Sequence, residues 1–586
     1  MKVLNSFQNM VKPFLLFLGF MMLQQAVQAQ FDIAGGSITG NFKLEAQTYQ
    51  EDSMIGAEKV AEKMRSNSYM NLKYSNGNFT AGIRFEGYLK TMLGYDQGYD
   101  GFGLANRFAS YSGELFEVTA GNFYEQFGNG LILRTYEDKD LGYDNSLDGA
   151  RVKIKPINGV VITGIIGQQR LYWEKGEGIV RGVDGEFSLN ELIPGLDSSE
   201  NRFILGGSFV SKFQADEDPL YILPENVGAG AGRLNFSRDG FILNTEFAYK
   251  GQDPSADNNK IYKPGSALLM NTNYSQSGLG IMVQYKWVDN MGFRSERGAQ
   301  LNNLNINYLP AITRNHAYAF AAMYPYATQI DGEAGFQTEI FYKFKKETLL
   351  GGKYGTQVTF NYARVHDIQR KALDSLTVIG QDGTDGYKTN FLSMSDSLLN
   401  QDINIEITKK LSDNWKVILT YQHLDFNQAA LQGHGGMVNT NTVIADISWR
   451  IKPKHTLRIE SQVLFTDKAD FAIDSLHSVK IKQDYGNWAM LVLEYSVSPH
   501  WFFALSDQFN FVSIDDEIAK NTFKYVHNGD DFHRNHYYTV AMGYSKGASR
   551  IQMSYGKQRE GILCVGGVCR NVPAAYGFNV SISSTF

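Results

Sequence analysis

Residues 120–155 read AGNFYEQFGNGLILRTYEDKDLGYDNSLDGARVKIK, and this stretch decides how the chain is interpreted. It begins and ends with strand-like alternation but holds a dense run of charges in between. The charged residues are Arg134, Glu137, Asp138, Lys139, Asp140, Asp144, Asp148 and, where alternation resumes, Arg151. A soluble domain would carry such a run on an exposed surface loop. The sharper interpretation is a loop, residues 124–149, that folds into the lumen of a membrane barrel.

Apolar and polar residues alternate in many other parts of the chain. Residues 37–49 place Ile38, Phe42 and Leu44 on one face and Lys43 and Glu45 on the other. Short turns such as Asn76-Gly77 connect these segments into hairpins. Strands of about ten residues with one apolar face are typical of a transmembrane β-barrel, although a soluble sandwich also alternates.

Two further features favour the barrel. Aromatic residues gather near the strand ends, and short turns alternate with the long polar connections 173–201, 289–302, 365–397 and 466–484. We therefore predict an all-β fold, a single large antiparallel transmembrane β-barrel over residues 30–586. We expect about 24 strands, within a range of roughly 22 to 26. This number counts the hairpins, the first and last strands, and one strand each near 203–213 and 316–323. Long extracellular loops and the absence of a separate plug domain belong to the same prediction.

The N-terminus predicts export. Lys2 and Lys12 form a basic region, and residues 14–23 form an apolar core that is too short to span a bilayer. Val27-Gln28-Ala29 supplies the small residues that signal peptidase requires, so residues 1–29 are predicted to be a cleaved signal peptide.

The C-terminus reads AAYGFNVSISSTF, which places an apolar series on one face of a last strand. The series is Tyr576, Phe578, Val580, Ile582 and the terminal Phe586. It resembles the closing strand of bacterial outer-membrane barrels, in which the terminal aromatic residue is an insertion signal. The motifs GNFYEQFGNGLILRTYED and DNSLDGARVK also resemble those of large, poorly characterised outer-membrane proteins of Bacteroidota. These resemblances imply an outer-membrane location in contact with lipid and lipopolysaccharide, and recognition by the barrel-insertion machinery.

Other chemistry finds little support in the residues. The net charge of −6 excludes a nucleic-acid partner, and no nucleotide, cofactor or nucleophile motif occurs in a suitable context, so we expect no enzyme and no cofactor. Asp138, Asp140 and Asp144 have calcium-like spacing but lack the closing Glu. The cluster HNGDDFHRNH (527–536) fits a polar outer loop better than a metal site. In an exported chain, Cys564 and Cys569 are expected to form a disulfide at the tip of the last outer loop.

Two functions remain. Alternation starts within ten residues of the predicted cleavage site, which argues against a TonB-dependent transporter. The first function is a porin-like channel that its own loops narrow or plug, with the acidic cluster of 137–148 facing Arg84, Arg134, Lys139 and Arg151 across the lumen. The alternative is a non-transporting barrel in a larger outer-membrane assembly for insertion, secretion or surface-protein display, with outer-membrane or periplasmic protein partners.

Overall fold

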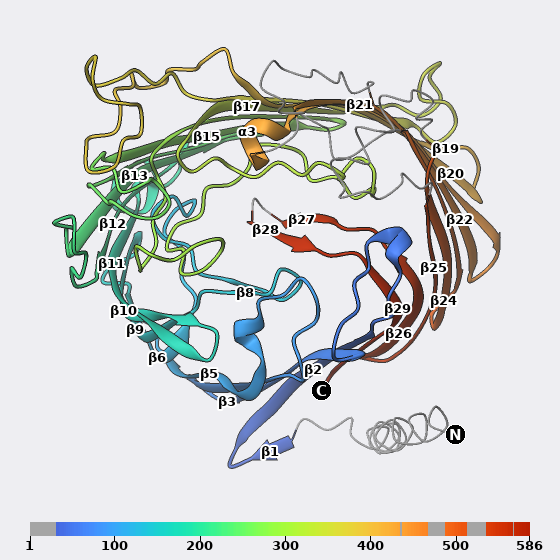
Figure 1. The fold of residues 1–586 in the computed structure, drawn as a ribbon, viewed down its shortest axis with the longest axis horizontal. Helices are drawn as coiled ribbons and strands as arrows, with labels where there is room; N and C mark the ends of the chain where they lie inside the picture. Colours follow the sequence, from blue (N-terminus) through green and yellow to red (C-terminus); the bar gives the residue numbers. More distant parts are fainter. Residues whose placement is uncertain (1–30, 434–435, 467–486, 512–534, 566–567) are drawn as a thin grey trace.

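In the computed structural model, residues 31–433, 436–466, 487–511, 535–565 and 568–586 are described. They form a 25-stranded antiparallel sheet in which β1 (Phe31–Ile33) pairs with β2 (Gly36–Thr48) alone. The other 24 strands close into a ring, which Figure 1 shows along its axis. The predicted all-β barrel of about 24 strands is confirmed. Within the described part of the chain, no helix has the length and apolar character needed to cross a membrane.

The strands of the ring follow the chain order without a crossover. After β2 they are β3 (Met64–Asn76), β4 (Phe79–Tyr88), β5 (Gly101–Ser112), β6 (Phe116–Phe123), β9 (Leu147–Ile154), β10 (Val160–Leu171), β11 (Glu174–Ser188), β12 (Arg202–Phe213), β13 (Asn226–Arg238), β14 (Phe241–Lys250), β15 (Gly265–Gln276), β16 (Leu279–Asp289), β17 (Gly332–Phe344), β18 (Thr356–His366), β19 (Leu398–Lys410), β20 (Trp415–Asn427), β21 (Met437–Lys452), β22 (His455–Thr466), β23 (Trp488–Val497), β24 (Trp501–Asn510), β25 (His536–Lys546), β26 (Ser549–Gln558) and β29 (Ala575–Thr585).

The wall of the ring has its apolar face outside. On β4, Ile83 and Phe85 point outward and are 38% and 43% exposed, whereas the alternate residues Arg84 and Glu86 are buried. Successive strand residues point to opposite faces, so this polarity follows directly from the period-two pattern. An apolar exterior around a polar interior is the inverse of a soluble protein and is the arrangement of a transmembrane barrel.

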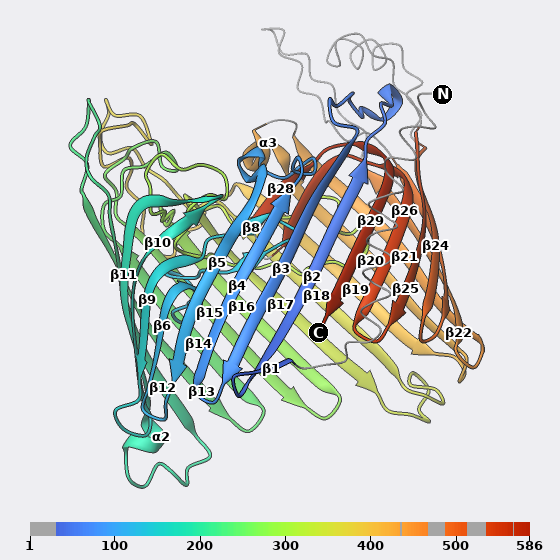
Figure 2. The ribbon, with the colours of Figure 1, turned by 90° about the horizontal axis from the view of Figure 1, so that it is seen from below.

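The two ends of the barrel differ. The end that holds the C-terminus carries mostly short turns, and the opposite end carries most of the long connections (Figure 2). Aromatic rings pair on the outer wall close to the short turns, with centroids 5.0 Å apart for Trp415–Trp449 and 4.6 Å apart for Trp501–Tyr544. Such rings prefer the depth of the lipid headgroups, so a membrane interface lies at this short-turn end.

Two predicted elements are wrong. Residues 173–201, expected to be a long loop, contain β11 and α2 (Leu189–Leu192), because the glycines and charges of β11 obscure its alternation. Residues 316–323, expected to be a strand of the wall, form no strand and belong to a long segment between β16 and β17. The strand count remains near 24 because the two errors offset each other.

The first and last strands of the wall meet at a seam. β2 pairs with β29, and the terminal Phe586 exchanges two backbone hydrogen bonds with Gly40, of 2.8 and 2.9 Å. The ring of Phe586 lies over Gly40, where a Cβ would come within 2.6 Å of it. Beyond Phe586, β1 continues the pairing by placing Phe31 opposite Ile38. The terminal residue therefore completes the seam as well as ending the chain.

Deleting Phe586 should lower the amount of assembled barrel several-fold, because the seam loses two backbone hydrogen bonds and the ring over Gly40. The heat-modifiable folded band in isolated outer membranes measures this amount. Thr585→Ala, which keeps the terminal ring, is the matched control and should assemble normally. Normal assembly of the deletion variant would contradict a role for Phe586 at the seam.

Candidate functional site

Several connections project into the ring in the view along its axis (Figure 1), and three of them carry the contacts described below. The first inserted segment, residues 124–146, connects β6 to β9 and contains the short strands β7 (Glu137–Asp138) and β8 (Tyr143–Asp144). The second inserted segment, residues 290–331, connects β16 to β17. The third is the hairpin of β27 (Gly561–Val565) and β28 (Val568–Val572). All three lie within the lumen of the barrel.

Apolar side chains anchor the first inserted segment. Leu131, Ile132 and Leu133 are 0% exposed and belong to one hydrophobic cluster with inward side chains of the wall and with the second inserted segment. The turn before them needs glycine at position 128, whose φ is +54° and where a Cβ would come within 2.3 Å of the Glu246 carboxylate. Glu246 of β14 accepts hydrogen bonds from the backbone N and the Nδ2 of Asn129, at 2.6 and 2.9 Å.

Charged side chains anchor the other end of the segment. Asp144 accepts a hydrogen bond of 2.7 Å from Arg170 of β10, another from Arg84 of β4, and one of 3.0 Å from the hydroxyl of Tyr124. Glu137 lies 2.7 Å from the Nη1 atom of Arg84. The side chains of Arg84, Arg170 and Asp144 are each at most 6% exposed. We call Arg84, Glu86, Glu137, Lys139, Asp144 and Arg170 the charged latch.

The charges of the latch balance across the contact. Glu86, also on the wall, accepts two hydrogen bonds from Arg170, of 3.0 and 2.7 Å. The wall therefore presents two arginines and one carboxylate, and the segment presents two carboxylates and Lys139, which lies 3.9 Å from Glu137. The carboxylates of Glu86, Glu137 and Asp144 lie within 4.8 Å of one another, close enough for a cation. Because arginines already face all three, we assign the cluster to docking of the segment.

Burial and charge shift the latch pKa values in opposite directions. Burial alone would raise the pKa of Asp144, but Arg170 and Arg84 outweigh it and hold that pKa below its usual range. Burial raises the pKa of Glu137, and Arg84 and Lys139 offset this only in part. Burial also lowers the pKa of Lys139 against the attraction of Glu137. Asp144 therefore stays ionised to a lower pH than Glu137.

The other charged residues of the opening stretch have different roles. Asp138 accepts hydrogen bonds from the backbone N atoms of Asp140 and Leu141, both at 3.0 Å, and so shapes a turn. Asp140 has a side chain that is 74% exposed and lies 3.2 Å from Lys43. The guanidinium of Arg134 lies 4.0 Å from the ring centroid of Tyr308 and 4.7 Å from that of Tyr136. The calcium-like spacing of Asp138, Asp140 and Asp144 thus does not bring three ligands together.

Two predicted lumen residues belong to the wall itself. Arg151 of β9 points inward and pairs with Glu117 and, at 3.2 Å, with Glu125. Asp148, on the same strand, has the opposite parity and points outward with Val152. Asp148 pairs there with Arg107 at 3.2 Å and with Lys175 at 2.7 Å. The expectation that Asp148 lines the lumen is therefore wrong, because β9 already begins at Leu147.

The sequence analysis did not reveal the second inserted segment, which covers a buried ion pair of the wall. Lys286 of β16 is 0% exposed, lies 2.5 Å from Glu333 and donates a hydrogen bond of 2.7 Å to Thr328. Backbone bonds of 2.9 Å join the two segments at Arg134–Ile306 and at Tyr308–Gly130. The sequence feature that could have revealed this segment is the Asn-rich run 302–307, whose side-chain amides form hydrogen bonds with both inserted segments. Asn307, for example, donates to the carbonyls of Met291 and Leu131, at 2.8 and 3.2 Å.

The β27–β28 hairpin meets both segments. Arg570 donates a hydrogen bond of 2.8 Å to the carbonyl of Asp140, and Asn302 donates one of 2.6 Å to the carbonyl of Cys569. Cys564 lies directly opposite Cys569 in the strand register, and the disulfide between them stays a prediction. The hairpin connects β26 to β29 at the long-connection end and folds into the ring (Figure 1), and the position of the pair at the tip of the last outer loop also stays a prediction. Of the predicted histidine cluster, residues 527–534 fall outside the described residues.

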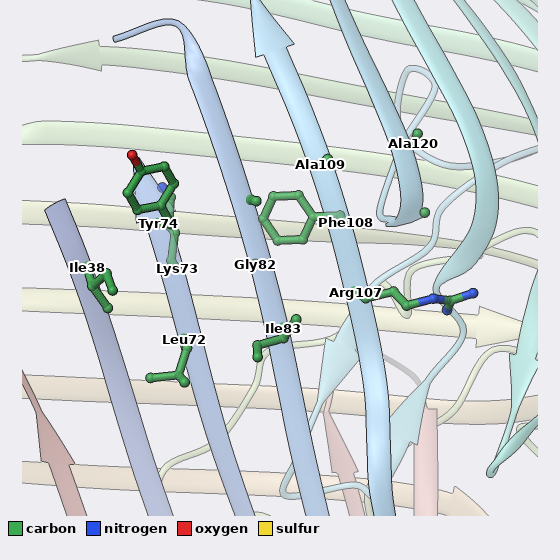
Figure 3. A pocket seen from close by; sticks show the side chains of 12 residues that line it. Ile38, Leu72, Lys73, Tyr74, Gly82, Ile83, Arg107, Phe108, Ala109 and Ala120 are labelled. Atoms are coloured by element: carbon green, nitrogen blue, oxygen red, sulfur yellow. The ribbon is translucent and has the colours of Figure 1, made fainter. Parts of the chain in front are cut away.

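A hollow of about 600 Å³ lies in the wall of β2–β6 (Figure 3). Its outer rim includes Ile38, Leu72 and Ile83, and two of its alanines, Ala81 and Ala109, are directly opposite in the register. The small alanine side chains leave this part of the outer wall shallow, and the lining is almost entirely apolar. An apolar hollow on an outward face is filled by lipid, so we do not assign a site to it.

A family model matches residues 10–586, and its description is "Family of unknown function (DUF6029)". The chain belongs to this family. No curated protein matches it.

Solved structures with a similar arrangement of strands include three barrels. The translocation pore of the P pilus usher PapC has a TM-score of 0.41 and 8% identity and covers 94% of this chain and 99% of its own. The siderophore receptor PirA of Pseudomonas aeruginosa has a TM-score of 0.39 and 10% identity, covering 94% and 80%. The outer membrane protein opdK of Pseudomonas aeruginosa has a TM-score of 0.34 and 10% identity, covering 73% and 97%. Likeness at this level carries no information about function.

Asp144→Asn should loosen the first inserted segment, because Arg84 and Arg170 would lose their shared carboxylate in a buried site. Removing one partner of a buried ion pair costs about 3–5 kcal/mol. Tryptic cleavage after Lys139 should therefore accelerate by about two orders of magnitude or more. Asp140→Asn, at a largely exposed side chain, is the matched control and should change stability by less than about 0.5 kcal/mol. Equal cleavage of both variants would show that the latch does not hold the segment.

The latch should withstand moderate acid. The lowered pKa of Asp144 means that its ion pairs stabilise docking above the ordinary value of 3.8 and are lost as the pH falls through the lowered pKa. The raised pKa of Glu137 has the opposite sign, so protonating Glu137 first does not undock the segment. A nitroxide label on Asp140→Cys should stay immobile from pH 7 to about 5 and become mobile only below about 4. Mobility that already rises near pH 6 would contradict this order.

Proposed function

We propose that the protein is an outer-membrane, porin-like channel whose lumen is closed by its own inserted segments. The observation that supports this most is the charged latch, in which the wall and the first inserted segment carry complementary charges. A ring of 24 strands encloses a lumen that wall side chains cannot fill, so it is either open or plugged. In this barrel, connections between strands of the wall fill the lumen. One end of the first inserted segment is held there by the ion pairs of the charged latch, which can separate.

The two anchors of the first inserted segment differ in what they allow. Residues 131–133 are locked in an apolar cluster, whereas residues 136–146 are docked through hydrogen bonds and ion pairs. Polar contacts re-form with water when they break, so a polar end is the part of a plug that can move while the rest stays in place. We infer that opening involves the latch end of the segment. Independence from TonB stays a prediction.

A non-transporting subunit of a larger assembly is the second candidate. The turn between β17 and β18 presents Leu349 and Leu350 at the short-turn end, and these side chains are 97% and 59% exposed. Two adjacent exposed leucines on this turn would suit contact with another protein. Purification in mild detergent followed by mass spectrometry would show a stoichiometric partner if the barrel is a scaffold.

Planar-bilayer recordings test the channel directly. The wild-type barrel should conduct little, Asp144→Asn should open more often, and a variant with residues 131–145 replaced by a short Gly-Ser linker should conduct most. Asp140→Asn, which leaves the latch intact, is the control and should behave as wild type. If the linker variant folds, as judged by heat modifiability, and is silent, the lumen is not a conduction path and the scaffold role is favoured.

A further inference from the structure

A cavity of about 480 Å³ lies inside the barrel, where both inserted segments face the wall of β15–β17. Six amide side chains line it: Gln126, Asn129, Asn271, Gln284, Asn315 and Gln337. The Oδ1 atom of Asn271 is buried and has no hydrogen-bond partner among the described residues. Amides both donate and accept hydrogen bonds, and an unsatisfied buried acceptor is costly unless something occupies the space next to it. The lining thus suits a ligand with several hydroxyl groups.

Arg134 adds a charge to this cavity. Its guanidinium lies against the rings of Tyr136 and Tyr308, and among the described residues no carboxylate forms an ion pair with it. The second arginine of the lining, Arg314, is compensated by Glu406 at 2.9 Å and by Glu339 at 3.9 Å. The positive charge of Arg134 is therefore available to a ligand, and guanidinium groups bind carboxylates in pairs of charge-assisted hydrogen bonds.

The short-turn mouth below the cavity is basic over one sector. The ranges 343–355, 409–416 and 450–454 hold ten Lys or Arg residues and two acidic residues, a net charge of +8. The whole chain has a net charge of −6, so the rest of it carries −14. A concentration of charge this far from the average of the chain creates a local field that attracts anions.

Contacts join these turns into one surface. Lys353 and Lys410, from neighbouring turns, lie 5.3 and 4.6 Å from the ring centroid of Tyr354. Arg450 of the third turn donates hydrogen bonds to the Oδ1 of Asn414 at 3.1 Å and to the carbonyl of Asp413 at 2.6 Å. Lys410 and Lys416 lie directly opposite each other in the register. Lys416 has the parity of the buried Thr420, so both lysines lie on the inner face of the wall.

The basic mouth leads towards the cavity. Lys343 and Glu339 lie on the inner face of the same strand, β17, four residues apart. At about 3.3 Å per residue the mouth is then roughly 13 Å from the cavity lining. An anion that the mouth attracts therefore reaches Arg134 within a short distance along one side of the lumen.

We infer that this cavity binds a small hydroxylated organic carboxylate, which the basic sector attracts from the short-turn end. The carboxylate pairs with Arg134, and the hydroxyl groups bind the surrounding amides. This inference rests on the proposed function only in treating the bound anion as a solute of the channel. Binding itself does not require conduction, so the two are tested separately.

Isothermal titration with D-glucuronate and D-glucose, on the full-length barrel in detergent, tests the site. The two probes share a hydroxylated ring and differ in the carboxylate. We expect glucuronate to bind at least tenfold more tightly than glucose, and Arg134→Gln to abolish that difference. Arg134→Lys, which keeps the charge, should retain part of it. Tryptic resistance at Lys139 verifies that each variant keeps its first inserted segment docked.

Each outcome decides the inference. Equal binding of glucose and glucuronate would make this a site for neutral saccharides, and binding of neither would remove it; both results overturn the proposal. An Arg134→Gln variant that is docked and still prefers glucuronate would also overturn it. A conducting Asp144→Asn barrel that binds no glucuronate would leave the channel proposal standing and the anion site rejected.

The basic sector has its own test in the reversal potential of the linker variant under a KCl gradient. Changing Lys345, Lys346, Lys353 and Lys410 to Gln should reduce the preference for chloride over potassium several-fold. The matched control changes Glu191 and Glu200, in the β11–β12 turn on another part of the same end, and should leave selectivity unchanged. An unaltered reversal potential in the lysine variant would show that the mouth does not select anions.

Discussion

Closure of the sheet is the constraint on which the rest of the structure depends. A transmembrane sheet cannot leave an edge unpaired in lipid, so the 24 strands must form a ring. A ring of that size encloses more space than the inward side chains of its wall can occupy. The inserted segments therefore fill the lumen with backbone, and this backbone needs hydrogen-bond partners of its own. The buried arginines, lysines and carboxylates of the inner wall meet that need.

Apolar and polar contacts hold the first inserted segment in different ways. The cluster around Leu131–Leu133 supplies attraction without direction, because burial of apolar surface depends on area alone. The latch supplies direction, since the fixed guanidinium donors of Arg84 and Arg170 pair with Glu137 and Asp144 in only one docked position of the segment. Buried ion pairs add little net stability compared with apolar packing. We therefore infer that the ion pairs of the latch select one docked arrangement of the segment.

The wall could be predicted from the sequence because its signal is local. The alternation of apolar and polar residues on β2 or β4 shows directly which face of the strand contacts lipid. The aromatic residues beside the turns indicate the membrane interface. The same logic failed on β11, whose glycines and charges leave no clear apolar face. It also failed to show that Asp148 points outward, because a boundary error of a few residues changes which side of the wall a residue is on.

The contents of the lumen could be predicted only in part. The charges of 134–148 drew attention to the first inserted segment, and Arg84 was among the expected partners. Glu86 and Arg170 were missed because each is one polar residue on an ordinary alternating strand, far from the segment in the sequence. The second inserted segment was missed because it has no periodicity. Its side-chain amides donate hydrogen bonds to backbone groups that come near only when the ring closes. The carbonyl of Leu131, which accepts a hydrogen bond from Asn307, is one of these groups.

The unequal anchors limit how far the plug can move. Fully burying a Leu or Ile side chain contributes about 1.5–3 kcal/mol, so withdrawing Leu131, Ile132 and Leu133 together costs roughly 5–9 kcal/mol. Such a withdrawal is populated too rarely to serve as routine gating. Separating the latch exposes mainly groups that water solvates well, and it leaves the apolar cluster in place. In the proposed channel, the passage that opens first therefore lies beside β4 and β10, where Arg84 and Arg170 would line it. A lumen lined by these two arginines and leading from the cavity of Arg134 would present positive charge to a solute at both places.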